Sequence, residues 1–247
     1  MDSDTLEFAR PGRISRATLT EQLEDALRSD ILDGVFAPGQ RLRASELTDR
    51  YGVSATPLRE ALQRLAAENL VDLDPRLGAT VSRISEDDLR DTYEQLSMVG
   101  GMALERSVQR GDGGWDAIVQ RRFDALRAAA SQLDGAEADS DDVRRQLTSD
   151  AAAAHWEFHD ALYQRCGSSW LLRFAKMLHS HAERYRRLSL HTSRTRHLDE
   201  EHEAIMLAAR ERDAVAAVDA LRAHLRATVE LLSEPFVEQR DGVAGSV

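Results

Sequence analysis

The sequence predicts a mainly α-helical protein, with an N-terminal winged helix-turn-helix over residues 17–84 and a C-terminal all-helical bundle over residues 86–234. The first part has short helical patterns separated by glycine, followed by two short strand-like runs. The second part has long helical periodicity with few glycines or prolines inside the runs. All eight histidines lie between residues 155 and 224, so the two parts also differ in chemistry.

The composition favours a cytoplasmic protein without a membrane segment. No run approaches the roughly 20 apolar residues that span a bilayer, the N-terminus is acidic, and Cys166 is the single cysteine. The net charge of -11 argues against nucleic acid at first sight. However, the segment from Arg10 to Ile84 has 11 arginines against 11 acidic residues, so it is neutral and can still present a cationic face.

The elements of the first domain follow from apolar spacing and from turn residues. Residues 19–32 carry a leucine and isoleucine stripe that ends before Gly34, and residues 44–51 form a second, short helix that Gly52 ends. Ser54 is a good N-cap for the next helix, which has Pro57 in its first turn. Two short helices joined in this way predict a helix-turn-helix, whose second helix enters the DNA major groove.

Two short strands, residues 70–73 and 79–82, then predict a hairpin wing. Arg59 and Arg64 on the second helix and Arg76 on the wing are placed to approach one duplex, since arginine binds guanine and phosphate. The alternative is that these arginines are solvated surface charges.

The run Gly-Val-Ser-Ala-Thr-Pro-Leu-Arg-Glu-Ala-Leu-Gln-Arg-Leu, residues 52–65, resembles the GntR family of bacterial regulators, as does the whole of residues 17–84. The resemblance implies a homodimer on a palindromic operator in double-stranded DNA. Ala55 and Ser45 depart from the family, which has arginine at the first position and often at the second. The candidate DNA-binding residues are Arg43, Ser45, Ser54, Thr56, Arg59, Arg64, Arg76 and Gly78.

The second domain is predicted to be a bundle of helices that starts after a short link at residues 83–85. We expect the acidic N-terminal arm and the tail from Ser233 to Val247 to be flexible. The predicted helices are Glu86–Arg110, Trp115–Leu133, Asp141–Cys166, Ser168–Leu188, Thr195–Glu211 and Asp213–Leu232.

Histidines on these helices have metal-ligand spacing. His155 and His159 lie four residues apart on one helical face, and His202 and His224 lie on helices with apolar periodicity. Imidazole suits zinc, nickel and copper. A lone pair of histidines at this spacing is more often a packing or surface feature, so the spacing by itself leaves both interpretations open.

This half resembles the FCD ligand-binding domain of the FadR-type branch of the GntR family, many members of which hold a metal with an aspartate and three histidines. The resemblance implies a divalent metal, zinc before nickel, at His155, His159, His202 and His224, with His155 in place of the aspartate. Four neutral ligands leave the charge of the ion uncompensated, which favours an anionic effector such as a small carboxylate.

Other positions of this domain also depart from the family. Relatives carry an arginine and a glutamate where this chain has Leu96 and Gly100. Arg184 and Arg187 are candidate effector-binding substitutes, with surface ion pairs as the alternative. The remaining histidines are expected at the surface: His179, His181, His191 and His197.

Three functions compete on these observations. The first is a ligand-responsive transcription regulator. The second is a zinc enzyme with His155, His159 and His202 as ligands and Glu157 or Glu203 as base, but position 156 is tryptophan where the His-Glu-x-x-His motif needs glutamate. In the third, the helical domain only dimerises and its histidines are core residues. The sequence favours the regulator over an enzyme.

Overall fold

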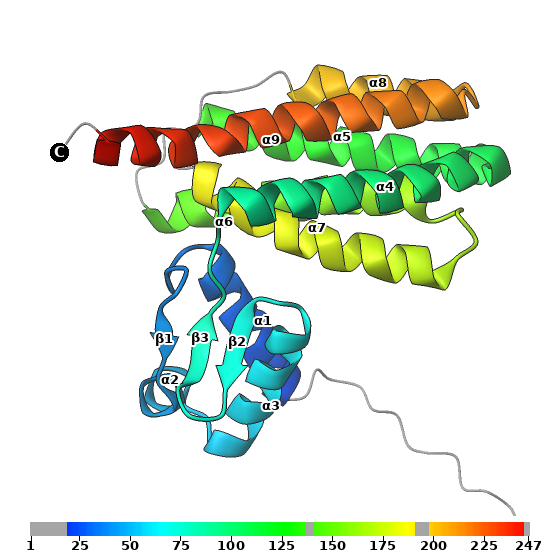
Figure 1. The fold of residues 1–247 in the computed structure, drawn as a ribbon. Coiled ribbons are helices and arrows are strands. Elements are labelled where there is room, and N and C mark those ends of the chain that lie inside the picture. The colour runs from blue at the N-terminus through cyan, green and yellow to red at the C-terminus, as the bar shows by residue number, and fades with distance from the viewer. Residues whose placement is uncertain (1–18, 137–140, 191–197, 245–247) are drawn as a thin grey trace, which may run out of the picture.

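The computed structural model describes residues 19–136, 141–190 and 198–244. These residues form a small N-terminal domain and a larger helical bundle joined by one strand-to-helix connection (Figure 1). The mainly helical architecture, with a small wing sheet, confirms the predicted fold class. The N-terminal arm, His191 and His197 lie outside the described residues.

The N-terminal domain contains three helices and three strands within the described residues. Its core is formed by one face of each helix and by the inward side of the sheet, with Leu27, Leu58 and Leu65 almost wholly buried. In chain order the elements are α1 (Leu19–Leu32), β1 (Arg41–Leu42), α2 (Ala44–Tyr51), α3 (Ala55–Ala67), β2 (Val71–Asp74) and β3 (Gly78–Val81).

The wing is a three-stranded antiparallel sheet in the order β1-β3-β2. Val71 pairs with Val81 and Asp74 with Gly78, so both strands lie within one residue of the predicted positions. Strand β1 was not predicted, because two residues are too short to show alternation. It pairs with β3 and fixes the wing to the chain just before α2.

The C-terminal domain is a bundle whose helices lie mostly along one direction (Figure 1).

The last helix is longer than predicted. It continues to Ala244, so the predicted tail from Ser233 is helical over most of its length. Helix α5 begins before Trp115, where the Asp112 side chain accepts the Trp115 backbone N–H at 2.8 Å. The helices are α4 (Glu86–Arg110), α5 (Gly113–Gly135), α6 (Asp141–Tyr163), α7 (Ser169–Leu190), α8 (Leu198–Arg210) and α9 (Ala214–Ala244).

One continuous apolar core runs through this bundle, with Leu104, Phe158 and Leu221 fully buried. Helix α4 packs against α7 and α9, and α6 packs against α5 and α7. Within the described residues, every helix is too short or too polar to cross a lipid bilayer.

The two domains meet along the C-terminal half of α7. The Arg184 side chain is 2% exposed and donates to the backbone carbonyls of Asn69 and Ser82 in the N-terminal domain. Arg187 donates to Asp33, at the end of α1, over 2.6 Å. The alternative of a surface ion pair is therefore wrong for Arg184, which is buried. Arg187 does form ion pairs, with Asp33 and Glu183, but at the part-buried domain junction rather than on the open surface.

Candidate DNA-binding surface and metal centre

The candidate DNA-binding residues all lie exposed on α2, α3, the turn between them and the wing. Arg59 makes no ion pair with any described residue, whereas Arg64 is 3.3 Å from Glu24 and Arg43 is 2.9 Å from Glu46. Ser54 occupies the N-cap position of α3, but its hydroxyl makes no capping hydrogen bond. That hydroxyl and the Arg59 guanidinium are therefore available to a ligand.

The tip of the wing is ordered by one side chain. The Asp74 carboxylate accepts the backbone N–H groups of Leu77 and Arg76, at 2.8 and 2.6 Å, and these bonds lower the pKa of Asp74. Gly78 has φ +84°, a conformation that favours glycine. The turn thus holds Arg76 and Gly78 at the exposed end of the hairpin.

Four histidines from three helices converge in the C-terminal bundle. His155 and His159 come from α6, His202 from α8 and His224 from α9. One ring nitrogen from each lies within 4.8 Å of the others, and the His202 and His224 ring centroids are 4.4 Å apart. His159, His202 and His224 are at most 3% exposed. The resemblance thus named four residues that the structure brings together.

His155 and His159 are in the protonation state that a metal needs. Burial, and then the neighbouring imidazoles, lower the pKa of His155 and of His159 well below 6.5, so both rings are neutral at pH 7. The Nδ1 atoms of His155 and His159 are buried without a hydrogen-bond partner among the described residues. The Glu201 carboxylate contacts His224 Nδ1 at 2.8 Å, which leaves Nε2 of that ring toward the cluster.

The donor set fits a divalent transition metal. Two nitrogens bound to one tetrahedral zinc ion are about 3.4 Å apart, because each bond is about 2.1 Å. The ligand atoms of the cluster lie within 4.8 Å of one another, so the histidines would move toward the ion by side-chain adjustment when it binds. Buried, neutral ring nitrogens that lack partners are otherwise costly. Glu157 and Glu203 are exposed on the bundle surface, so neither suggested base lies in the cluster.

A second set of residues borders this cluster and escaped the sequence analysis. His179, Glu183 and Arg186 lie on α7, and ligand atoms of His155, His179 and Glu183 are all within 4.8 Å of one another. The surface prediction for His179 is wrong, since its side chain is 9% exposed and its ring lies 5.5 Å from that of His155. The spacing His-x3-Glu-x2-Arg puts the three on one helical face, which is the signal that could have found them.

Helix α4 presents no charge to the bundle at the two positions where the family has one. Leu96 is 3% exposed within the apolar core. A Cβ at Gly100 would lie 2.9 Å from the Tyr163 hydroxyl, so glycine makes room for this ring. His181, also predicted at the surface, is part-buried and contacts the Asp88 carboxylate at 3.0 Å.

A helix-turn-helix with a wing, followed by a helical bundle, defines a DNA-binding transcription regulator. Residues 19–81 match the family described as bacterial regulatory proteins, gntR family, and residues 91–227 match the FCD domain. The protein therefore belongs to the GntR family, in the branch that carries an FCD domain.

Relatives of known name support the same class. The transcriptional regulator BphR of Paraburkholderia xenovorans is 36% identical over 88% of this chain and 86% of its own length. The transcriptional repressor GlaR of Escherichia coli is 30% identical over 84% of this chain and 93% of its own length. These relatives are regulators, and the protein is a regulator rather than an enzyme.

Solved structures share the fold. Escherichia coli McbR/YncC superposes with a TM-score of 0.72 at 21% identity, covering 90% of this chain and 100% of the other. A GntR regulator from Rhodococcus sp. RHA1 gives 0.68 at 20% identity, covering 86% and 96%. At these identities the likeness concerns the fold alone.

Proposed function

We propose that this regulator binds its operator with an affinity controlled by a small carboxylate, which is held at a divalent metal bound by His155, His159, His202 and His224. The observation that carries the proposal is the convergence of four imidazoles, one part-buried and three buried, on one point. The lowered pKa values of His155 and His159 keep these two rings neutral. Zinc is the expected ion, with nickel as the alternative, because the ligands are nitrogens of intermediate softness. The ion would supply positive charge and coordination positions for a carboxylate oxygen.

The proposed DNA-binding residues act in two groups. Ser54, Thr56, Arg59 and Arg64 lie on or just before α3, which would enter the major groove, while Arg76 and Gly78 on the wing would contact the backbone or the minor groove. Arg43 and Ser45, at the start of α2, are proposed to contact phosphates. Exposure of all these residues supports the assignment.

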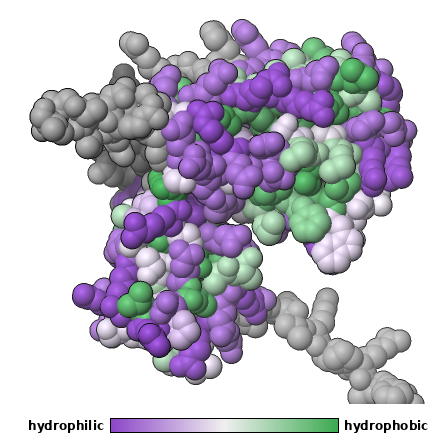
Figure 2. Space-filling model, viewed as in Figure 1, coloured by the Kyte–Doolittle hydropathy of each residue, from purple (hydrophilic) through white to green (hydrophobic). Residues whose placement is uncertain are grey.

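We also propose that the protein is a homodimer on a palindromic operator, because a two-fold axis matches two half-sites. An exposed apolar surface of the bundle supports this proposal: α4 and α7 pack side by side and expose large apolar side chains. Figure 2 shows a green, hydrophobic area on the helical domain. We propose that a second copy of this protein packs against this surface. These side chains are Met98, Met102, Trp170, Phe174 and Met177.

Helix α7 supports a coupling between the two domains. It carries His179 beside the histidine cluster and, less than three turns later, Arg184 and Arg187, which bind the N-terminal domain. A ligand changes operator affinity only if it binds one arrangement of the domains better than another. By analogy with the repressors among its relatives, we propose repression that the effector relieves.

DNA binding with and without metal tests this function. Operators would first be selected from random duplexes by the purified protein, and affinity then measured with a panel of small mono- and dicarboxylates. We expect at least one acid to weaken operator binding about tenfold in zinc-loaded protein, which is about 1.4 kcal/mol. The acid should have no effect on the His159→Ala variant. Equal effects with and without zinc would contradict the proposal.

A further inference from the structure

We propose that Arg186 and His179 form an anion subsite beside the metal centre, in which a carboxylate of the effector replaces Glu183 as the partner of Arg186. The inference rests on the proposed function, because His155 belongs both to the four-histidine cluster and to the set with His179 and Glu183.

The Glu183 carboxylate lies between the Arg186 guanidinium and the histidine cluster. The Glu183 carboxylate accepts Arg186 Nε at 2.7 Å and Arg186 Nη2 at 2.8 Å, a two-pronged ion pair. Glu183 is itself within 4.8 Å of ligand nitrogens of His155 and His179. The Arg186 side chain is 16% exposed and that of Glu183 is 8%, so the pair is shielded from solvent.

His179 supplies a second, independent sign of a ligand. Its Nε2 atom is buried and has no hydrogen-bond partner among the described residues. Its ring stacks on that of His155 at 5.5 Å and lies 4.5 Å from the Trp156 ring, so it is held beside the cluster. A buried polar atom left without a partner costs about 1–3 kcal/mol. A ligand oxygen at this position would remove that cost.

The same residues do not suit a second metal ion. Both Glu183 oxygens already accept guanidinium N–H groups, from Arg186 and Arg187, and a second cation would be repelled by both arginines and by the first ion. A carboxylate, in contrast, offers Arg186 the same two-oxygen partner that Glu183 now provides. The ligand class is therefore a small organic acid.

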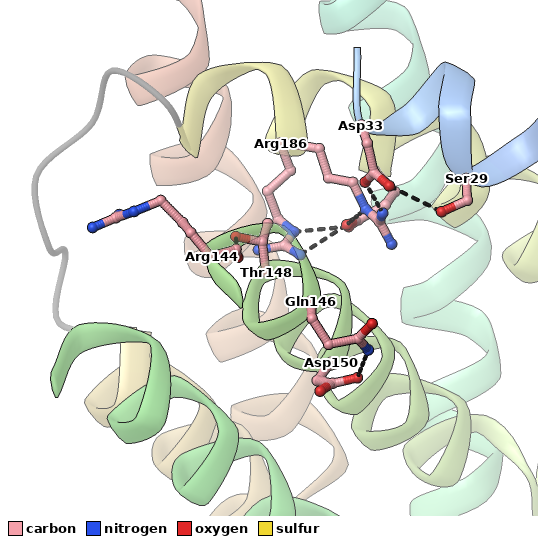
Figure 3. Close-up of polar contacts among 9 residues, drawn as sticks. Ser29, Asp33, Arg144, Gln146, Thr148, Asp150 and Arg186 are labelled. Atoms are coloured by element: carbon pink, nitrogen blue, oxygen red, sulfur yellow. Dashed lines mark hydrogen bonds and ion pairs between the residues drawn. The ribbon is translucent and has the colours of Figure 1, made fainter. Parts of the chain in front are cut away.

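Replacement of Glu183 by an effector carboxylate at Arg186 would also affect the contact with the DNA-binding domain. Glu183 Oε1 accepts Arg187 Nε at 2.9 Å, and Arg187 Nη1 donates to Asp33 at 2.6 Å. Asp33 in turn accepts the Ser29 hydroxyl within α1 at 2.9 Å. Figure 3 shows the Arg186 and Asp33 side chains close together, each with its own dashed contacts to neighbouring polar groups. A Glu183 released from Arg186 would be free to turn toward the other N–H groups of Arg187, including the one that Asp33 now accepts, and this would loosen the contact between α7 and α1.

Succinate and acetate are the probes for this subsite, measured by calorimetric titration of zinc-loaded full-length protein. We expect Arg186→Gln to weaken binding of the tighter probe at least tenfold while one zinc per chain is retained. Glu183→Gln should strengthen binding at least threefold, because Arg186 loses its competing partner. The Glu183→Gln, Arg186→Gln double variant leaves no unpaired carboxylate, so it separates lost binding from misfolding. Arg122→Gln, at an ion pair with Glu157 on the bundle surface, is the matched control.

The outcomes separate the subsite from the metal centre. Wild-type affinity in Arg186→Gln, or no binding of either probe to Glu183→Gln, would overturn the subsite while the zinc remains bound. Two zinc ions per chain would overturn it in favour of a second metal. Absence of zinc from the wild-type protein would instead refute the proposed metal centre. If succinate or acetate binding to that protein still depended on Arg186, the subsite would stand without the metal.

Discussion

His155 is the residue that sets this centre apart from the family pattern of an aspartate and three histidines. Its ring lies 4.7 Å from His159 and 5.0 Å from His202, close enough for all three to share an ion. A neutral imidazole at this position brings no negative charge. In the proposed function, the effector carboxylate would then be the anion that balances the divalent ion.

Replacing this histidine by the family residue is therefore informative. We expect His155→Asp to keep one zinc per chain, because carboxylate is also a zinc ligand, and to weaken carboxylate binding about tenfold, because the ion is partly neutralised. Zinc content by mass spectrometry and titration with succinate would show this. Unchanged succinate affinity in a zinc-loaded His155→Asp protein would refute the charge argument.

The buried histidines also predict how the metal-free protein responds to acid. Burial, with Glu183 opposing and Arg186 and His224 adding to it, lowers the pKa of His179 to about 4 from 6.5. Between these values the unfolded chain binds a proton that the folded chain refuses, so stability is complete above pH 6.5 and falls below it. His179 alone should cost about 2 kcal/mol of unfolding free energy between pH 7.5 and 5.

Urea unfolding of chelator-treated protein at the two pH values measures this loss. His155 and His159 lie in the same surroundings with pKa values also lowered, so they add to it. The His179→Asn variant should lose less stability over the same range than the wild type. Equal unfolding midpoints at pH 7.5 and pH 5 for the wild type would contradict the burial of neutral imidazoles.

At the scale of elements, periodicity and turn residues were enough to predict most helices. Helices α1, α2 and α4 begin and end where apolar stripes and glycines place them, and the structure adds a Ser85 cap at the start of α4. Strand β1 depends on tertiary pairing, so local patterns missed it. Helix α9 continues past Pro235, a residue that normally ends or kinks a helix, so the sequence predicted an earlier end. His179, Glu183 and Arg186 were missed because the use of one face of α7 depends on which helix lies opposite.

Helix α3 carries a direct prediction for DNA binding. Arg59 is exposed on this helix without a described ion-pair partner, so its guanidinium is free to bind a base or a phosphate. We expect Arg59→Ala to weaken binding to a selected operator by about 1–3 kcal/mol. Fluorescence anisotropy with a labelled duplex would measure it, and Arg122→Ala, in the other domain, is the control. Equal affinities of the two variants would remove Arg59 from the interface.

For the whole molecule, the arrangement of two copies decides whether two recognition helices reach one palindrome. The exposed apolar side chains of α4 and α7 are the proposed dimer surface. A carboxylate at Phe174, which is 45% exposed, would be desolvated in that interface. We expect Phe174→Glu to be a folded monomer with weak operator binding, whereas Val215→Glu, at a 73% exposed site on α9, should stay dimeric.

Light scattering gives the mass of both variants, and circular dichroism shows whether each is folded. A folded, dimeric Phe174→Glu protein would exclude this surface. The dimer could also form without any sensing role for the histidines, which would then be ordinary core residues. The metal centre is thus the claim on which the account of regulation depends.

Metal analysis of the purified protein tests that claim most directly. We would measure metal content and zinc-dependent melting for the wild type and for a His159→Ala, His202→Ala double variant. The account predicts about one tightly held transition metal per wild-type chain, a melting temperature that falls when the metal is removed, and neither property in the double variant. A wild-type protein that holds no metal and melts at the same temperature with added zinc or nickel would contradict it.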